Sequence, residues 1–404
     1  MEALEPTNGN EIRDFVTSRL KALLDSFSIL NVGHITRFVE PINQKIGLTE
    51  ALEILSSRED INCLPVEGDR GVMGLVHKQD LLKKKSPLTS PPVERFVDQK
   101  GFYLDASENC EKAMETILKR SPDRLYDDFM IYRHGRYFGI GTFSDLSKNI
   151  AEIHNTDLVQ ARKMQEFLIG RNSVDGPGLA VKKYLRMAHE IGGDYLQCMA
   201  IHDKLSLISS FDVCGKGTAA ALLTSTLSSF FSTLKVCGLL GSHDSQSILT
   251  MLNGVVMDQT PEEVFVAGAL VFVDWQRQEV TFFNCGYSPL YVFFTDAESG
   301  KTKGRIVGPH LMPLGINTFT DPKGQTSAIS KNLRVFIHSD GLTDACDERG
   351  ERYGEERLRK FLYPKCMKPV DALLDELDRE IKEFTGSAPQ TDDITVVVAE
   401  ISAH

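Results

Sequence analysis

Four short aspartate motifs in the C-terminal half place the strongest constraint on how this chain can fold. They are Gly192-Gly193-Asp194, Asp212 in FDVCGKG, Asp340 in HSDGLTD, and the pair Asp392-Asp393 in TDDIT. Three of the four abut an apolar, β-branched run that is typical of a buried strand. Carboxylates at strand ends can converge on one edge of a sheet and hold hard divalent metal ions. These motifs therefore predict a metal-dependent hydrolase.

Aspartate suits this chemistry because Mg²⁺ and Mn²⁺ prefer an octahedron of oxygen ligands and keep several waters. Two such ions about 4 Å apart can activate a water molecule and neutralise the charge of a phosphate monoester. The neighbouring glycines allow tight turns close to the ions. Taken alone, an SDG or DDI sequence usually indicates only a turn, so the prediction depends on all four motifs together.

The composition excludes several other classes of protein. The chain has 404 residues, enough for two or three domains, and its net charge of −11 argues against nucleic-acid binding. The acidic N-terminus lacks the pattern of a signal peptide, and Lys235 with many Ser and Thr interrupts the most lipid-like stretch, Leu222 to Leu240. The eight scattered cysteines contain no CxxC pair. We expect a cytoplasmic protein with reduced thiols and no membrane contact.

The N-terminal part contains an approximate internal repeat, preceded by a helix predicted from about Glu11 to Leu30. The first copy runs from about Asn31 to Lys85 and the second from about Val93 to Ile153. Each copy has the order strand, turn, strand and short helix. A helical apolar stripe follows, which is typical of core packing or a dimer seam. The predicted domains are 1–150, a connector helix and break at 151–176, and 177–404.

Strand-like runs dominate the C-terminal domain, and two helices are clear, Thr218 to Val236 and Val370 to Phe384. Antiparallel strands with segregated helices indicate an α+β layered fold. The GKGT sequence is not a phosphate-binding Walker loop, because Gly217 follows Lys216 and Ser210 stands at the first glycine position. No GxSxG elbow or HExxH motif occurs.

Six motifs in one order then resemble a known family. They are EIGGDYLQ, FDVCGKGTAAALLTS, NCGYSPLYVF, MPLGI, HSDGLTDACDERGERYGEERL and DDITVVV. Together they look like the PPM-type protein serine/threonine phosphatases of the SpoIIE/RsbU branch. The resemblance implies a two-sheet β-sandwich flanked by helices, with a binuclear Mn²⁺/Mg²⁺ centre.

The resemblance also implies roles for individual residues. Asp212 would bridge the two ions, and the carbonyl of Val213 would bind one of them. Asp340 and Asp392 would bind the other ion, with Asp393 as the alternative ligand. Asp194 would act directly or through metal-bound waters.

Two residues depart from the family pattern around Asp212, and a third, Lys216, stands where His or Lys is common. Phe211 replaces glycine, and it is interpreted as the last strand residue. Cys214 replaces serine, and we expect a small packed residue, since a redox role would require an exposed thiol of low pKa. Lys216 could attract the substrate phosphate or could be a solvated turn lysine.

The implied reaction is hydrolysis of a phosphoserine or phosphothreonine protein by activated water. In this branch the usual substrate is a phosphorylated anti-sigma-factor antagonist of a partner-switching pathway. The alternative from another class is a non-catalytic scaffold that uses the phosphatase fold to bind partners.

The N-terminal repeat resembles a tandem pair of cystathionine-β-synthase (CBS) motifs, carried by LPVEGDRGVMGLVHKQDLL and MIYRHGRYFGIGTFSDL. Such modules commonly bind adenine nucleotides, using a Thr or Ser three residues before an Asp. Thr142 and Asp145 match this pattern, whereas His77 replaces the hydroxyl residue before Asp80 in the first copy. The chain would then be a regulated phosphatase and a homodimer. Alternatively, the module binds no ligand and only mediates dimer contacts, or nucleotide sensing is the main function.

Overall fold

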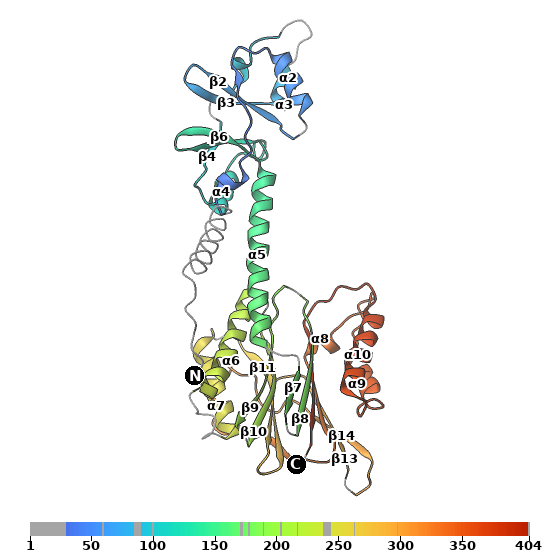
Figure 1. Cartoon of the computed structure of the whole chain (residues 1–404). Helices are drawn as coiled ribbons and strands as arrows, with labels where there is room; N and C mark the ends of the chain where they lie inside the picture. Colours follow the sequence, from blue (N-terminus) through green and yellow to red (C-terminus); the bar gives the residue numbers. More distant parts are fainter. Residues whose placement is uncertain are drawn as a thin grey trace, which may run out of the picture. The chain divides into compact units, whose positions relative to one another are not determined.

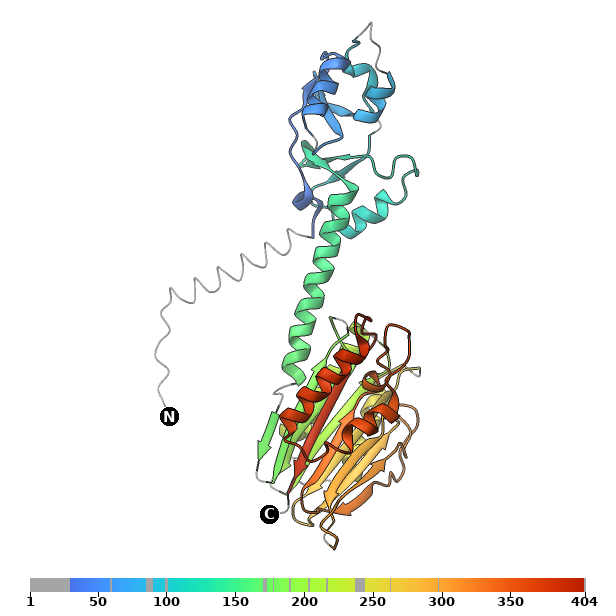
Figure 2. The ribbon, with the colours of Figure 1, turned by 90° about the vertical axis from the view of Figure 1, so that its right-hand side faces the viewer.

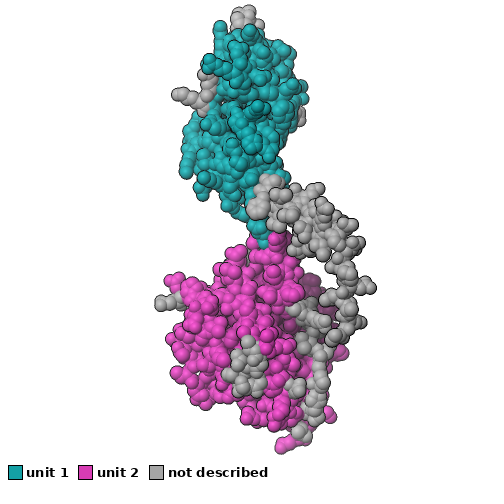
Figure 3. Space-filling view, turned by 60° about the vertical axis from the view of Figure 1, so that its left-hand side comes forward, with its two compact units in different colours: residues 1–157 teal, residues 158–404 magenta. Residues whose placement is uncertain are grey.

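The computed structural model describes residues 30–402, except 59, 85–89, 99–100, 170–172, 177, 189, 203, 216, 237–243, 262 and 297. The N-terminal helix expected up to Leu30 and the side chain of Lys216 therefore lie outside the described residues. The chain forms two compact units, Met1–Asp157 and Leu158–His404 (Figure 3). Each unit is described by itself.

Unit 1 contains two copies of one small α/β arrangement (Figure 1). The first copy consists of η1 (Val32–Ile35), β1 (Ile42–Asn43), α2 (Leu48–Ser57), β2 (Cys63–Gly68), β3 (Gly71–His77) and α3 (Lys78–Lys84). The second consists of η2 (Val93–Phe96), β4 (Tyr103–Asp105), α4 (Cys110–Ile117), β5 (Phe129–Arg133), β6 (Arg136–Gly141) and the start of α5 (Phe143–Ile169). In each copy the first strand pairs parallel with the second, and the second pairs antiparallel with the third.

The two copies exchange their leading segments. Arg37, between η1 and β1 of the first copy, pairs with Ile140 in β6, and Asp98, between η2 and β4 of the second copy, pairs with Leu75 in β3. The two apolar clusters also mix the copies: Met130 and Ile140 join the cluster built mainly by the first copy, and Val32 joins the one built mainly by the second. The repeated topology confirms the tandem arrangement expected from the sequence.

The helix α5 is longer than the stripe that was expected from residue 151. It begins at Phe143, directly after β6, and continues to Ile169. No glycine or proline occurs between these residues, so nothing in the sequence separates the short helix of the second copy from the connector. The helix is thus shared along the chain by both units.

Unit 2 is a sandwich of two sheets. The five-stranded sheet has the order β15 (Gln325–Ala328), β12 (Glu279–Cys285), β11 (Val266–Asp274), β10 (Leu205–Val213) and β9 (Asp194–His202). The six-stranded sheet has the order β14 (Thr302–Val307), β13 (Leu290–Thr295), β16 (Leu333–His338), β17 (Ile394–Ile401), β8 (Leu179–Arg186) and β7 (Ser173–Gly176). This sandwich confirms the fold class expected for the C-terminal domain.

Helices cover the outer faces of the sandwich. Helices α6 (Thr218–Val236) and α7 (Ser245–Gln259) pack with the five-stranded sheet, and α9 (Gly354–Leu362) and α10 (Val370–Thr385) with the six-stranded sheet (Figures 1 and 2). The central position of β17 explains why its sequence is apolar throughout. Val397 and Ala399 enter the core shared with the other sheet, whereas Val396 and Val398 pack with α9 and α10. A strand buried on both faces reads as a continuous apolar run.

Among the helices that the structure describes, none combines the length and apolar character that crossing a membrane requires.

Candidate metal centre

Two of the predicted aspartates lie side by side in the five-stranded sheet. Asp194 opens β9, and Asp212, near the end of β10, is its antiparallel partner. The next residue, Val213, ends β10, and its amide donates to the Gly193 carbonyl at 3.3 Å. Asp194 is only 4% exposed, and its Oδ2 has no hydrogen-bond partner among the described residues. A buried carboxylate oxygen without a partner is costly, which indicates that it serves a ligand.

The other predicted aspartates lie at the matching end of the six-stranded sheet. Asp340 begins the short helix α8 (Asp340–Thr343) after β16, and Asp392 stands two residues before β17. The intervening Ser339 fixes these two chain segments to each other. Its amide donates to the Thr395 carbonyl at 2.9 Å, and its hydroxyl donates to the Asp393 carbonyl at 3.0 Å.

Asp392 and Asp393 differ in their surroundings. Asp393 is 7% exposed, and its carboxylate accepts the amides of Ala188 at 2.8 Å and Gly193 at 3.1 Å. It therefore joins the end of the six-stranded sheet to the glycine segment that leads into β9. Asp392 is exposed, and its Oδ1 accepts the amide of Asp393 at 2.9 Å.

The carboxylates of the two sheets influence one another. Burial, followed by the charge of Asp212, raises the pKa of Asp194 well above its ordinary value, and Asp340 contributes further. Burial, followed by Asp392 and Asp344, raises the pKa of Asp340. Repulsion of this kind is relieved by bound cations. In the described part of the chain, no three acidic, His or Cys side chains are already arranged around one point as ligands. Carboxylate oxygens are the donors that hard ions such as Mg²⁺ prefer, and these ions complete their shell with waters.

This electrostatic strain predicts how the metal-free protein responds to pH. Above the ordinary carboxyl pKa of 3.8, the folded state holds a proton on Asp194 that the unfolded state has released. The free energy of unfolding should therefore fall as the pH rises from 3.8 toward the raised pKa. Melting temperatures in chelator at about pH 5 and pH 7.5 should show a shallower decline for Asp194→Asn than for the wild-type chain. Equal declines would contradict this assignment.

Neighbouring residues include one that the sequence did not single out. The buried Tyr287 hydroxyl lies 2.7 Å from Ser210 Oγ, and burial together with the charge of Asp194 raises the pKa of Tyr287. Phe211 is fully buried opposite Gly268 of β11, which leaves space for its ring. The NCGYSPLYVF motif was the available signal for Tyr287.

The expectation that Cys214 is packed was wrong. Cys214 is exposed, and its amide donates to the Phe265 carbonyl at 3.0 Å. It lies beyond the end of β10, next to Gly215, whose φ of +105° turns the chain away from the sheet. The side chain therefore has no core to enter.

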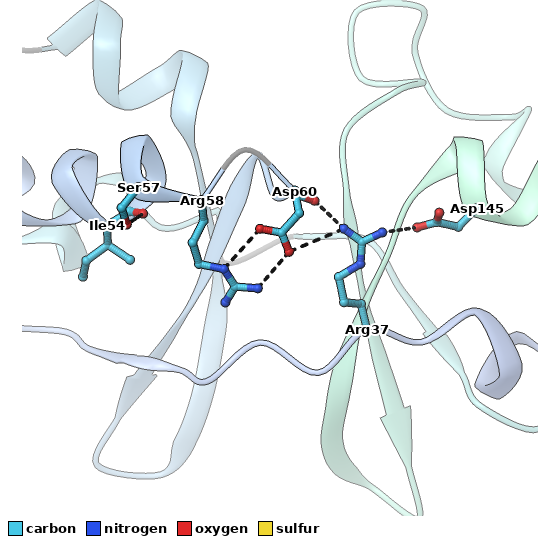
Figure 4. Close-up of polar contacts among 6 residues, drawn as sticks. All are labelled: Arg37, Ile54, Ser57, Arg58, Asp60 and Asp145. Atoms are coloured by element: carbon cyan, nitrogen blue, oxygen red, sulfur yellow. Dashed lines mark hydrogen bonds and ion pairs between the residues drawn. The ribbon is translucent and has the colours of Figure 1, made fainter.

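The CBS candidates occupy polar positions within unit 1. The Thr142 hydroxyl accepts the Asp145 amide at 2.9 Å and so caps the start of α5. The Asp145 carboxylate pairs with Arg37 at 3.4 Å, and the same guanidinium contacts Asp60, which also pairs with Arg58 (Figure 4). Arg37 thus joins the leading segment of the first copy to both copies.

In the first copy, the corresponding residues are placed differently. His77 is largely buried at the end of β3. Asp80, in the first turn of α3, pairs with Lys83 at 3.7 Å and with Arg124 of the second copy at 3.8 Å. Both aspartates of the repeated pattern therefore already have arginine partners.

Two families of known proteins match parts of this chain. Residues 203–402 match the family described as Stage II sporulation protein E (SpoIIE), and residues 32–86 match the CBS domain. The SiaA-PP2C domain of Pseudomonas aeruginosa has a similar fold, with a TM-score of 0.53 and 18% identity, covering 63% of this chain and 99% of that one. The PP2C domain structure of SpoIIE from Bacillus subtilis has a TM-score of 0.45 and 19% identity, covering 57% of this chain and 64% of that one.

Among curated proteins, IcfG of Synechocystis sp. is 22% identical over 268 residues, or 61% of this chain. The alignment spans 41% of IcfG, so the chain matches about two fifths of that protein's length.

The two-sheet sandwich with helices on its outer faces is the fold that this chain shares with the SiaA-PP2C domain. The chain thus carries a SpoIIE-type phosphatase domain over residues 203–402 and a CBS domain over residues 32–86. This family consists of protein serine/threonine phosphatases, which are hydrolases that act on phosphoric monoesters.

Proposed function

We propose that this chain is a metal-dependent phosphoprotein phosphatase that hydrolyses phosphoserine or phosphothreonine with a pair of Mn²⁺ or Mg²⁺ ions. The observation that carries the proposal is the buried, unpartnered oxygen of Asp194 beside Asp212 and within the field of Asp340. A carboxylate buried beside a second carboxylate, as Asp194 is beside Asp212, marks a candidate functional site.

Each aspartate has a proposed role. Asp212 would serve both ions, the Val213 carbonyl would help hold one of them, and Asp340 and Asp392 would hold the other. Asp194 would act directly or through metal-bound waters. When bound, the ions supply charge neutralisation for the phosphate and activate the attacking water. The protein residues hold the carboxylates in position and keep solvent from Asp194.

Asp393 is proposed to support the centre rather than to bind an ion. Its two carboxylate oxygens already accept the amides of Ala188 and Gly193. An ion bound by this carboxylate would compete with both amides for its oxygens and weaken two hydrogen bonds that join the sheets' ends. Asp392, in contrast, is exposed to solvent, and its Oδ1 accepts the neighbouring amide of Asp393.

The substrate class is proposed from the family, together with the acidic character of the chain. A phosphorylated protein of the anti-sigma-factor antagonist type would place the chain in a partner-switching pathway of the cytoplasm. A homodimer is the proposed assembly, with no nucleic-acid or membrane partner.

We further propose that the CBS module regulates the phosphatase and that an adenine nucleotide is its ligand class. A cavity of about 360 Å³ is lined by Arg37, Asp145, Lys148 and Asn149, among others. The Asn149 Oδ1 is buried and lacks a partner within the described residues, which supports a polar ligand. Arg37 would exchange Asp145 for a phosphate when the nucleotide binds. Calorimetric titration with AMP and ATP tests this site.

Phosphate release from a phosphoserine protein tests the catalytic proposal. We expect release with Mn²⁺, none in excess chelator, and recovery when Mn²⁺ is returned. Asp340→Ala should remove the Mn²⁺-dependent release. A chain that is inactive with Mn²⁺, or whose activity survives Asp340→Ala, is instead the non-catalytic scaffold.

A further inference from the structure

The last turns of α5 contain one buried polar side chain on a helix that is otherwise largely exposed. Gln165 is 2% exposed, whereas the neighbouring Met164 is 61% and Phe167 is 81% exposed. All three residues belong to unit 2. Burial of a single glutamine in such a helix requires partners for both ends of its amide.

Both ends of the Gln165 amide are satisfied by one residue of the metal centre. Gln165 Nε2 donates to the Gly192 carbonyl at 2.7 Å, and Gln165 Oε1 accepts the Gly192 amide at 3.1 Å. The pair of bonds fixes Gly192 in position and in orientation. One turn earlier, Arg162 pairs with Glu190 at 3.2 Å on the surface, so the same helix contacts the same segment twice.

Gly192 has no room to move away from this contact. A Cβ at Gly192 would lie 2.1 Å from Asp393 Oδ2, so the backbone is enclosed between the Gln165 amide and the Asp393 carboxylate. The following Gly193 donates its amide to Asp393 and accepts the Val213 amide. Asp194 comes next and lies opposite Asp212.

We infer that Gln165 is a positioning residue of the phosphatase centre. By holding Gly192, it sets the placement of Gly193 and Asp194 and thereby the affinity of the site for its ions. The inference rests on the proposed function and deepens it, because it names the contact through which a change in α5 alters the metal centre. Gln165 itself touches neither ion nor substrate.

The test compares three chains: wild type, Gln165→Met, and Gln160→Ala. Methionine keeps the length and flexibility of glutamine but removes both hydrogen bonds. Gln160 is an exposed glutamine on the same helix and serves as the matched control. Two quantities are measured on the full chain: Mn²⁺ affinity by calorimetry with the metal alone, and amide hydrogen exchange of the segment around Gly192 in chelator.

Gln165→Met is expected to weaken Mn²⁺ binding about tenfold and to speed exchange around Gly192 by a similar factor, since two hydrogen bonds are lost. Saturating Mn²⁺ should restore the rate of phosphate release to near the wild-type value. Gln160→Ala should match wild type in every measurement. Gln165→Asn, which is shorter, should recover little of the Mn²⁺ affinity.

The inference is overturned if Gln165→Met lowers the melting temperature while Mn²⁺ affinity and exchange around Gly192 stay at wild-type values. That result would assign Gln165 a purely structural role and leave the phosphatase proposal intact. Failure of the proposed function has a different signature, in which the wild-type chain itself neither binds Mn²⁺ nor releases phosphate. In that case the positioning role falls with it.

Discussion

Asp392→Asn and Asp393→Asn are expected to inactivate the protein for different reasons, the first by weakening metal binding and the second by destabilising the fold. Asp392→Asn should lower phosphate release at limiting Mn²⁺ about a hundredfold or more, because an ion loses a charged ligand. Its free energy of unfolding should change by less than about 0.5 kcal/mol, since Asp392 is exposed. Asp393→Asn should reduce the free energy of unfolding by about 2 kcal/mol.

The reason for the second effect lies in the acceptors that Asp393 supplies. Two amides, those of Ala188 and Gly193, point at its two oxygens. An asparagine has one side-chain oxygen and can accept only one of these two amides. Its NH₂ group would then point at the other amide, so that two donors face each other. Activity should also decline, because the bond from the Gly193 amide helps to hold the next residue, Asp194, in place.

Urea denaturation in chelator and Mn²⁺ calorimetry separate the two variants. Asp392→Asn should keep the wild-type denaturation midpoint and lose Mn²⁺ affinity, while Asp393→Asn should shift the midpoint. Asp371→Asn provides a control, because this exposed residue lies in the first turn of α10 and pairs with Lys182. Reversed behaviour of the two variants would make Asp393 the ligand.

Gly341→Ala should be among the most damaging single-methyl changes in unit 2. A Cβ at Gly341 would lie 2.0 Å from the Asp393 carbonyl oxygen and 2.9 Å from its carbon. Backbone atoms cannot rotate away as a side chain can, and this carbonyl is also held by the Ser339 hydroxyl. We expect a loss of about 3 kcal/mol in the free energy of unfolding, at the upper end of overpacking effects.

Gly254→Ala is the matched control for this substitution. Gly254 lies within α7, and a Cβ there would meet no atom within 4 Å. Removing a glycine from a helix interior should stabilise the protein by about 0.5–1 kcal/mol. Thermal unfolding of both variants measures the difference, and a Gly341→Ala protein as stable as Gly254→Ala would show that the two chain segments can separate.

The sequence allowed the strands and the four aspartate motifs to be predicted because each depends on local patterns. β17 is an example, since its apolar run directly follows Asp392 and Asp393 in the sequence. The two-sheet sandwich was instead supplied by the family resemblance.

Contacts between distant residues could not be predicted in this way. Gln165 meets Gly192 across 27 positions, and Asp393 meets Gly193 across 200. Nothing in the pattern around Gln165 distinguishes it from the exposed Gln160 of the same helix. The exposure of Cys214 was likewise missed, because it depends on where the turn after β10 directs the chain.

The exchange of leading segments in unit 1 has a consequence for how that unit can be altered. Since Arg37 pairs with β6 and Asp98 with β3, each copy supplies a segment that borders the other copy's sheet. Separating the copies would expose both borders, and an unpaired strand edge is open to association with another molecule. We therefore expect the two copies to fold together, so that deletion of either copy destabilises the other.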